Sequence, residues 1–517
     1  MFMQKSKSWQ GLVEIIVYTM TFGILAHAYC YFNLQFSHDS LWALYQKTDN
    51  AWQIGLGRFL QPVYRCFRGE ITAPFLIGAL SLLWLAIAIF ILVRVLDLKY
   101  KWSVVLICGI LSTNVVLTLA NATYLPWSDV FMLSFLFSVS AVYVSDRYTY
   151  GFIGGAFFIC ASLALYQSYF QVSVILFMIL LIKHIYEGEP PLAVIRKAIY
   201  AGCSLVIALI LYYVFVKFSL CVTGLKLVDH YNGLVNVLDF SKVSVVQLCF
   251  QAFKRSIMYF INPDGKNNYH FLALINVAVL LFLVSGVLRI CCKNKICRLN
   301  ISMLATLIIL MPLGMNIVYV ISKGLEHTLM IFSFFFVYVF VVYVSDYNCS
   351  LKSNWNYNNF TMPLVLKCVT VTMFGLFIFS NIIFANQVYL RKSLEFQATL
   401  SVMTRIVDRI EQTPGFDAAN NRVAIIGDFV KSPLSKSRPG FERVSGVGIC
   451  CNYAPTYYQT FDKYFAYILG YPIALISEDE AKKLARLPEV RVMRSFPAID
   501  SCKVINKVMI VKISDIR

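Results

Sequence analysis

Long apolar runs recur along the first three quarters of this chain and constrain its fold more than any other feature. Most approach the roughly 20 residues that an α-helix needs to cross about 30 Å of hydrocarbon. The runs lie at about residues 12–34, 74–96, 103–121, 127–145, 151–165, 170–185, 197–219, 270–290, 300–321, 328–345 and 363–386. Backbone groups inside a bilayer must be satisfied within the protein, which favours helices. The sequence therefore predicts an all-α polytopic membrane protein with about eleven transmembrane helices.

The composition supports lipid as the solvent of this chain. Hydrophobic residues make up 59% of the 517 positions and charged residues only 14%, with a mean hydropathy of +0.68. A soluble chain of this length needs far more surface charge. The net charge of +18 does not indicate a nucleic-acid partner, because the lysines and arginines form short clusters between apolar runs rather than one basic block.

The distribution of these basic clusters predicts the orientation of the chain. If the runs alternate across the membrane, one set of ends is basic: Lys5, Lys7, Arg94, Lys99, Lys101, Lys183, Arg196, Lys197, Arg289, Lys293, Lys295 and Arg298. The short connections at the other ends contain a single basic residue, Lys323. Basic loops stay in the cytoplasm. We therefore expect a cytoplasmic N-terminus and, in a bacterium, an inner-membrane protein with a periplasmic C-terminus.

The chain divides into a multi-pass part, residues 1–390, and a soluble periplasmic domain, residues 391–517. The multi-pass part has two long outside loops, residues 35–73 and 220–269. In the tail, residues 391–413 predict a helix that extends the last span, 422–428 a strand, 477–486 a capped helix, and 504–513 one half-buried strand. This pattern predicts a small α/β domain. Between 151 and 185, either two helices or one long bent helix fits.

The first outside loop contains the residues best suited to chemistry. Asp39 follows the first run closely, and Asp49, Arg58, Arg65 and Arg68 come later in the loop. A carboxylate at the membrane surface can take a proton from an acceptor hydroxyl. Arginines hold phosphate through planar, multi-donor contacts. The pattern suits sugar transfer from a lipid phosphate, and it also suits an interfacial loop whose arginines meet anionic headgroups.

Other polar residues have two interpretations each. Asp129 lies at the outer mouth of the fourth run, where it is either functional or an ordinary helix N-terminal residue. Tyr166 and Gln167 either line a sugar pocket or pack between helices. Lys254 and Arg255, in an amphipathic segment of the second long loop, either grip a phosphate or anchor that segment at the interface.

The histidines and cysteines leave further alternatives open. Glu326, His327 and His270 lie at outside helix ends, where each either reaches a site or faces solvent. The basic-loop cluster of Cys291, Cys292 and Cys297 lacks a zinc-site spacing. If the tail faces an oxidising compartment, one disulfide fits among Cys450, Cys451 and Cys502.

Four short motifs stand out in the multi-pass part: Ser37-His38-Asp39-Ser40, Gly57-Arg58-Phe59-Leu60-Gln61-Pro62, Tyr124-Leu125-Pro126-Trp127-Ser128-Asp129 and Leu165-Tyr166-Gln167-Ser168-Tyr169. With these motifs the chain resembles the GT-C glycosyltransferases, and within them the type-II O-antigen glucosyltransferases of serotype-converting phages and enteric bacteria. The likeness covers about residues 10–390 and thins out in the tail. Members of that family often have two adjacent acids in the first loop. This chain has His38-Asp39, so Asp39 acts either alone or together with Asp49.

The resemblance implies glucosyl or hexosyl transfer from an undecaprenyl-phosphate sugar to the O-antigen repeat at the periplasmic face. Transfer would invert the anomeric carbon, which requires a base and no protein nucleophile. The resemblance implies Asp39 as the base, with Asp49 as the second catalytic candidate. Taken with the residue-by-residue reasoning, the substrate-binding candidates are His38, Arg58, Arg65, Asp129, Tyr166, Gln167, Lys254 and Arg255. In the tail, Tyr453, Tyr457, Tyr458 and Tyr464 either stack on the acceptor glycan or pack in a core.

The implied partners are the bilayer, the two lipid-linked substrates, a bactoprenol glucosyltransferase that makes the donor and a small flippase that moves it across the membrane. No cofactor is implied; Asp39 and Asp49 can share a divalent ion, but a single carboxylate base needs none. The sequence contains no glycine-rich phosphate loop. The alternatives are an O-antigen polymerase or ligase and a flippase for lipid-linked oligosaccharide.

Overall fold

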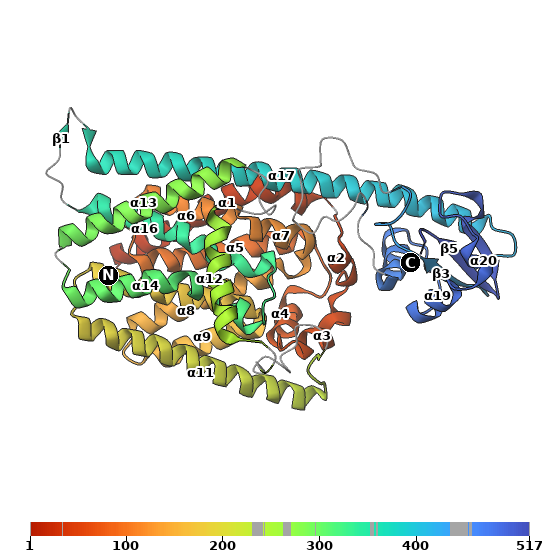
Figure 1. The fold of residues 1–517 in the computed structure, drawn as a ribbon, viewed down its shortest axis with the longest axis horizontal. Helices are drawn as coiled ribbons and strands as arrows, with labels where there is room; N and C mark the ends of the chain where they lie inside the picture. The colour runs from red at the N-terminus through yellow and green to blue at the C-terminus, as the bar shows by residue number, and fades with distance from the viewer. Residues whose placement is uncertain are drawn as a thin grey trace.

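Two bodies make up the molecule, a long bundle of helices and a small α/β domain at its C-terminal end (Figure 1). The computed structural model describes residues 2–33, 35–229, 241, 243–261, 270–294, 296–351, 356–357, 360–434, 453 and 458–515. We refer to the end of the bundle that faces the C-terminal domain as the domain end, and to the opposite end as the far end.

The bundle contains the predicted transmembrane helices. Among the described residues, nine helical segments are long and apolar enough to cross a membrane, and two shorter apolar helices join them. The elements are α1 (Phe2–Phe32), α5 (Pro74–Leu96), α6 (Lys101–Thr113), α7 (Val115–Thr123), η2 (Leu125–Trp127), α8 (Ser128–Arg147), α9 (Gly151–Leu165), η3 (Gln167–Tyr169), α10 (Phe170–Tyr186), α11 (Pro191–Thr223), α13 (His270–Asn294), α14 (Arg298–Gly314), α15 (Ile317–Ile321), η5 (Thr328–Phe334), α16 (Phe335–Ser350) and α17 (Met362–Glu411). They coincide with the eleven apolar runs, so the polytopic membrane fold is confirmed.

Two of the apolar stretches are interrupted by a residue whose backbone is not helical. Tyr166 has an extended backbone (φ −158°, ψ 113°) and separates α9 from η3 and α10. Residues 151–185 are therefore two helices rather than one bent helix. Asn114 separates α6 from α7, and its side chain accepts a hydrogen bond from the Leu117 amide at 2.9 Å. This cap satisfies a backbone donor that the break would otherwise leave unpaired.

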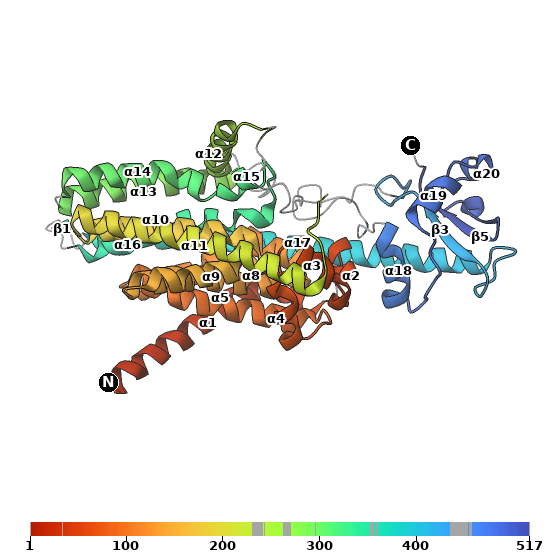
Figure 2. The same ribbon diagram turned by 90° about the horizontal axis from the view of Figure 1, so that it is seen from below.

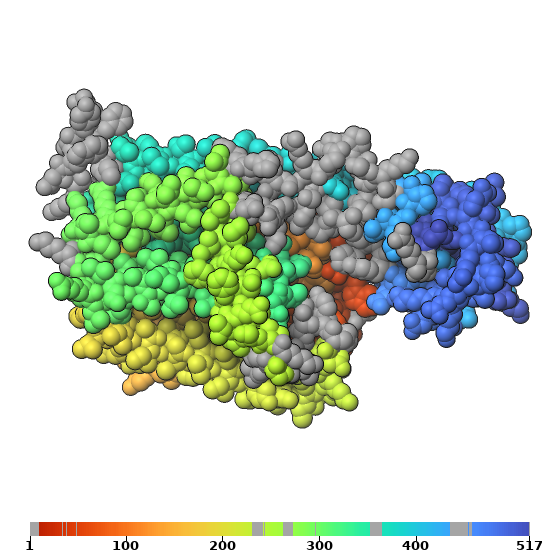
Figure 3. Space-filling view, viewed as in Figure 1, coloured from red at the N-terminus to blue at the C-terminus, as the bar shows by residue number. Residues whose placement is uncertain are grey.

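One helix of the second long loop lies across the bundle instead of along it. This helix, α12 (Val245–Ile261), crosses the direction of α13 and α14 in the ribbon and space-filling views (Figures 2 and 3). Leu248, Ala252 and Ser256 form its buried stripe at four-residue spacing, whereas Phe250 and Lys254 are exposed. A helix with one buried face and a mixed apolar and basic outer face suits the membrane interface.

The first outside loop folds into four short helices at the domain end. They are α2 (His38–Trp42), η1 (Gln46–Asp49), α3 (Asn50–Gly55) and α4 (Leu60–Arg68). A hairpin of β1 (Asn356–Tyr357) and β2 (Phe360–Thr361) precedes α17 at the far end. From there α17 runs without interruption through the bundle into the C-terminal domain (Figure 1). The prediction that residues 391–413 extend the last span is confirmed.

The C-terminal domain has a three-stranded sheet in the order β3-β5-β4, with β3 (Arg422–Ile426) parallel to β5 (Val508–Lys512) and β4 (Cys502–Ile505) antiparallel to it. Its helices are η6 (Tyr458–Thr460), α18 (Phe461–Lys463), η7 (Tyr464–Ile468), α19 (Glu478–Leu484), α20 (Pro488–Arg491) and η8 (Ile499–Ser501). The predicted strand at 422–428 and the capping box of Ser477 with Glu480 are confirmed.

The prediction of one strand over residues 504–513 is wrong. The segment belongs to a hairpin that turns at Asn506 and Lys507, both of which have positive φ (51° and 61°). Asn tolerates this left-handed region well, so the turn was present in the sequence as a short-range signal. The returning strand β5 is buried along its whole length rather than on alternate residues, because it is the central strand and both of its faces are covered.

The domain is packed onto the membrane bundle. Phe36 and Leu41, from the first outside loop, are buried in the same hydrophobic cluster as Met403 of α17 and Phe461 of the domain. Tyr464 lies fully inside this cluster, so its side chain is a core residue. The residues Tyr457, Cys450 and Cys451 lie outside the described part of the chain. The described Cys502 is buried in the domain.

Candidate active site

A cavity of about 910 Å³ lies at the domain end of the bundle. Its walls come from the first outside loop, from the breaks around residues 124–131 and 166–168, from residues 318–330, and from the C-terminal domain. Asp39, Asp49 and Arg58 all line it. The structure thus brings together polar residues that are separated by more than 400 positions in the sequence.

Asp39 is positioned by a short capped helix. Ser37 and Ser40 form a capping box around the start of α2, and Ser37 Oγ also donates to the carbonyl of Thr123 at 2.7 Å. These bonds fix the first turn of α2, which contains Asp39, against the end of α7. Asp39 is half-buried and its side chain lines the cavity. The side chain of His38 lies outside the described part of the structure.

Asp49 lines the same cavity from a more enclosed position. Its side chain is 1% exposed, and Oδ2 accepts from Gln53 Nε2 at 2.7 Å and from Arg65 Nη1 at 3.5 Å. Burial raises the pKa of the Asp49 carboxyl above its usual value, while the Gln53 hydrogen bond and the Arg65 charge oppose that shift. The two carboxylates therefore differ in environment, with Asp39 the more accessible.

Arg58 is the only lysine or arginine among the described residues that line the cavity. Its Nε donates to Gln167 Oε1 at 3.1 Å and its Nη1 donates to Gln53 Oε1 at 3.2 Å. The guanidinium carbon lies 4.9 Å from the centre of the Tyr166 ring. These hydrogen-bond partners are neutral and orient the guanidinium, and its charge also acts on the nearby Asp49 carboxylate. The cavity thus has one oriented guanidinium suited to a phosphate.

A family model described as Glucosyl transferase GtrII matches residues 28–345, which is more than half of the chain. The chain belongs to the GtrII glucosyl transferase family. No curated protein and no solved structure matches it. The matched residues include every part of the cavity wall that the bundle provides, whereas the C-terminal domain lies beyond them.

Membership of the GtrII family confirms the family resemblance of the sequence motifs. The protein is a membrane glucosyltransferase, and the family model begins within α1 and ends within α16. Tyr166 and Gln167 line the cavity of this GtrII-family enzyme. Gln167 also donates to the Leu56 carbonyl at 2.7 Å, which holds the first loop against the α9–α10 break.

Arg65 and Asp129 lie behind the cavity wall of the GtrII-family enzyme instead of lining it. Arg65 is 1% exposed and donates to Asn50 Oδ1 at 2.7 Å as well as to Asp49. Asp129 is fully buried and accepts from Arg68 at 3.3 Å and from Tyr64 at 3.0 Å. Both ion pairs tie the helices of the first loop to each other or to α8, so they support the cavity from outside.

Lys254 and Arg255, which were predicted as phosphate-binding candidates, also lie away from the cavity. Both side chains are exposed on α12. Arg255 forms an ion pair with Glu326 at 2.6 Å, and its guanidinium carbon lies 5.3 Å from the centre of the Tyr319 ring. Through this pair α12 holds the turn at residues 322–327, part of which lines the cavity.

Several wall residues were not singled out from the sequence. The C-terminal domain contributes Gln459, Thr460 and Glu478 beside the predicted Tyr458, and the bundle contributes apolar residues between 318 and 330. Glu478 has the sequence signature of a helix first turn, which gave no reason to place it at a site. The domain residues reach the cavity only because the domain packs onto the first loop, and no local pattern encodes that contact.

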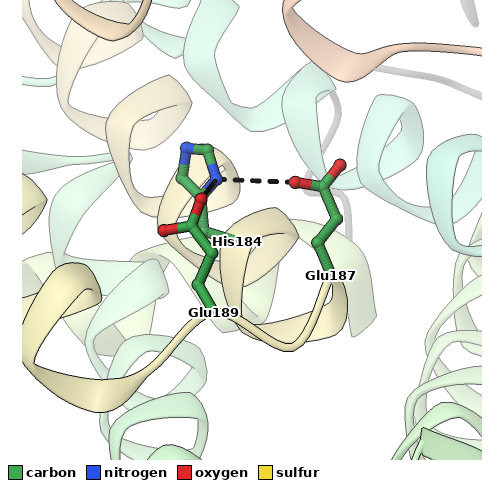
Figure 4. Close-up of side chains that lie close together, drawn as sticks. All are labelled: His184, Glu187 and Glu189. Atoms are coloured by element: carbon green, nitrogen blue, oxygen red, sulfur yellow. Dashed lines mark ion pairs between the residues drawn. The ribbon is translucent and has the colours of Figure 1, made fainter.

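A second polar cluster of the GtrII-family enzyme lies at the far end of the bundle. His184, Glu187 and Glu189 place ligand atoms within 4.8 Å of one another, and both carboxylates face the imidazole (Figure 4). Lys197 Nζ lies 2.6 Å from Glu189 Oε1, and Asp146 Oδ1 lies 2.9 Å from His184 Nε2. Because Lys197 already supplies the positive charge, we interpret the cluster as an ion network that joins α8, α10 and α11.

Proposed function

We propose that this enzyme transfers glucose from undecaprenyl-phosphate glucose to the O-antigen repeat of lipopolysaccharide, with inversion at the anomeric carbon. The observation that supports this most strongly is the composition of the cavity wall. Transmembrane elements form one side of the cavity and a soluble domain forms the other, and the first outside loop places two carboxylates and one arginine between them. Such a site suits a donor that remains in the bilayer and an acceptor that extends into water.

A lipid-linked donor fits the distribution of polar groups. Arg58 would hold the phosphate through its remaining donor atoms, while Leu56, Phe131 and Leu329 provide an apolar wall beside it. The sequence has no glycine-rich loop for a nucleotide phosphate. The family match to glucosyl transferases supports glucose as the transferred sugar.

Asp39 is the general base in this proposal, and Asp49 is the alternative. An inverting transfer needs one base that takes the proton of the acceptor hydroxyl as that oxygen attacks C1. The carboxylate of Asp39 is the more accessible of the two. Asp49 is held by Gln53 and Arg65, which suits the placing of a sugar hydroxyl better than proton uptake. We propose that no metal ion takes part.

The C-terminal domain would hold the acceptor glycan. Gln459 is exposed, lines the cavity and offers both a hydrogen-bond donor and an acceptor, as sugar recognition requires. Tyr458 also lines the cavity, although its hydroxyl donates to the Ile476 carbonyl at 3.0 Å. By the distribution of basic residues, the far end faces the cytoplasm of a bacterial cell and the domain end the periplasm.

The test is O-antigen analysis in cells that supply lipid-linked glucose and express wild type, Asp39→Asn, Asp49→Asn or Asp97→Asn. Asp97 is the matched control, because it is exposed at the far end and has a left-handed backbone that asparagine tolerates. Mass spectrometry of the repeat should show one added hexose with wild type and Asp97→Asn. Loss of a general base should slow transfer by about 10²- to 10⁴-fold.

Three results would contradict parts of the proposal. Full transfer by Asp39→Asn, with loss in Asp49→Asn, would make Asp49 the base. An added hexose that disappears when membranes are treated with EDTA would overturn metal independence. A wild type that adds no hexose but changes O-antigen chain length or export would replace the transferase proposal with a polymerase, ligase or flippase.

A further inference from the structure

His327 joins two walls of the cavity through both nitrogens of its ring. The residue caps the start of η5, where its Nδ1 accepts a hydrogen bond from the Leu329 amide at 3.2 Å. Its Nε2 lies 3.2 Å from the hydroxyl oxygen of Tyr124, which follows α7. The two rings meet edge to face, with centroids 5.6 Å apart. Both side chains line the cavity.

The Leu329 contact determines the tautomer of His327. An amide N–H can donate only to a ring nitrogen that bears no proton, so Nδ1 is unprotonated. The proton of the neutral imidazole is therefore on Nε2, and Nε2–H donates to the Tyr124 hydroxyl oxygen. Since that oxygen accepts from His327, the phenolic proton of Tyr124 must point to a different acceptor. The histidine thus fixes the direction in which Tyr124 donates.

The turn that contains His327 is itself held in place. Glu326 is paired with Arg255 of α12 at 2.6 Å, and the Gly324 amide donates to the Tyr319 carbonyl at 2.9 Å. Gly324 has a φ of +95°, which is a conformation that a residue with a side chain rarely adopts. A turn fixed on both sides gives the imidazole a defined position, as a positioning residue requires.

We propose that His327 is a positioning residue that directs the O–H of Tyr124 to an oxygen of the donor's phosphate. This inference rests on the proposed glucosyl transfer. In that reaction the acceptor oxygen bonds to C1, its proton passes to the carboxylate base, and the C1–O bond to phosphate breaks. The leaving lipid phosphate takes the electron pair and gains one negative charge. A donor aimed at that phosphate stabilises the transition state more than the bound substrate.

Two amide substitutions separate positioning from capping. In His327→Asn the side-chain oxygen can replace Nδ1 and keep the Leu329 bond, but residue 327 no longer donates to Tyr124. In His327→Gln the longer side chain can place its NH₂ group near the position of Nε2 and donate to Tyr124, at the expense of the cap. The rates are measured with full-length enzyme in detergent, undecaprenyl-phosphate glucose and a lipid-linked O-antigen acceptor, after equal folding is confirmed by melting temperature.

We expect His327→Asn and Tyr124→Phe each to lower kcat by roughly 10- to 100-fold with little change in KM, because only the transition-state donor is lost. His327→Gln should stay within about threefold of wild type. In a Tyr124→Phe background, His327→Asn should cause no further loss.

The opposite pattern would overturn the inference. If His327→Asn is active and His327→Gln is not, the residue is only a helix cap. If the two losses multiply in the double variant, His327 does not act through Tyr124. A wild-type enzyme that transfers no glucose under these conditions would instead refute the proposed function, before any variant is compared.

Discussion

The buried pair of Arg65 and Asp49 allows a quantitative test of how the first loop is held together. Each side chain is 1% exposed, and the charged atoms lie 3.5 Å apart. The perturbation is Arg65→Met, which fills a similar volume without a charge. It leaves Asp49 buried with Gln53 as its remaining described hydrogen-bond donor. Asn50 also loses the donor that lies 2.7 Å from its side-chain oxygen.

Removal of one partner from a buried ion pair typically costs about 3–5 kcal/mol, because the other charge is left uncompensated. Replacement of both partners by neutral groups is far less costly. We therefore expect Arg65→Met to lower the free energy of unfolding by about 3–5 kcal/mol. The double variant Arg65→Met/Asp49→Asn should be more stable than the single variant, because it contains neither charge.

The pH dependence follows from the pKa of Asp49. Burial already raises that pKa and Arg65 opposes the shift, so Arg65→Met should raise it further. A carboxyl whose folded-state pKa is raised favours the folded state at low pH and disfavours it as pH rises through that pKa. The stability deficit of Arg65→Met should thus be largest at neutral and alkaline pH. It should shrink on acidification, as Asp49 becomes neutral.

The assay is thermal unfolding in detergent with a thiol-reactive fluorophore. Unfolding is read as the rise in signal above that of the already exposed cysteines, as the buried Cys30, Cys108 and Cys160 become accessible. A loss of about 3–5 kcal/mol should lower the melting temperature by on the order of 3–5 °C in a chain of 517 residues. A double variant that melts at or below Arg65→Met would refute the reasoning. A deficit that stays constant between acidic and alkaline pH would also contradict it.

Three further substitutions test other parts of the structure. Arg58→Gln should raise the KM for undecaprenyl-phosphate glucose by about 10- to 100-fold, since it removes charge-assisted bonds to a phosphate; initial rates against donor concentration check this, and an unchanged KM would contradict a phosphate role. Glu326→Gln breaks a half-exposed ion pair with Arg255, so the melting temperature of the variant should shift by less than about 2 °C. Its kcat should fall, because the turn positions His327. An unchanged kcat would contradict that link. Lys512→Met removes a buried ammonium that donates to the carbonyls of residues 490, 491 and 493. The substitution should destabilise the C-terminal domain by about 2–4 kcal/mol, which trypsin would detect as faster cleavage within residues 412–515. Protease resistance equal to that of wild type would refute this prediction.

The helices of the bundle were predictable because hydrophobicity is a local signal. Each apolar run predicts a transmembrane helix by itself, independently of the helices it packs against. The break at Tyr166 was predictable from the polar residues inside an apolar run. The continuation of α17 beyond the membrane was predictable from the amphipathic pattern that follows the last apolar run. The turn at Asn506 was missed because Asn506 and Lys507 lie between apolar residues on both sides, without a glycine or proline, so they resemble the polar positions of one strand.

The candidate site was predictable only in part, because no local sequence pattern predicts which distant segments come into contact. The acids and arginines of the first loop were identifiable from their type and position. The different environments of the arginines were not predictable. Arg58 lines the cavity, whereas Arg65 forms an ion pair with Asp49 and Arg68 forms one with Asp129. Residue type predicts what a side chain can do, and only tertiary packing decides whether it is available to do it.

The continuity of α17 has a consequence for how the enzyme can vary. Its 50 residues span about 75 Å at 1.5 Å per residue, so the C-terminal domain is joined to the membrane by a rigid rod and not by a flexible tether. One inserted residue would raise the domain by only about 1.5 Å but turn it by about 100° around the rod, away from Phe36 and Leu41. Seven inserted residues would nearly restore the angle and lift the domain by about 10 Å. The rotation of the domain around α17, more than its height above the membrane, therefore limits which insertions and deletions in this helix the enzyme can tolerate.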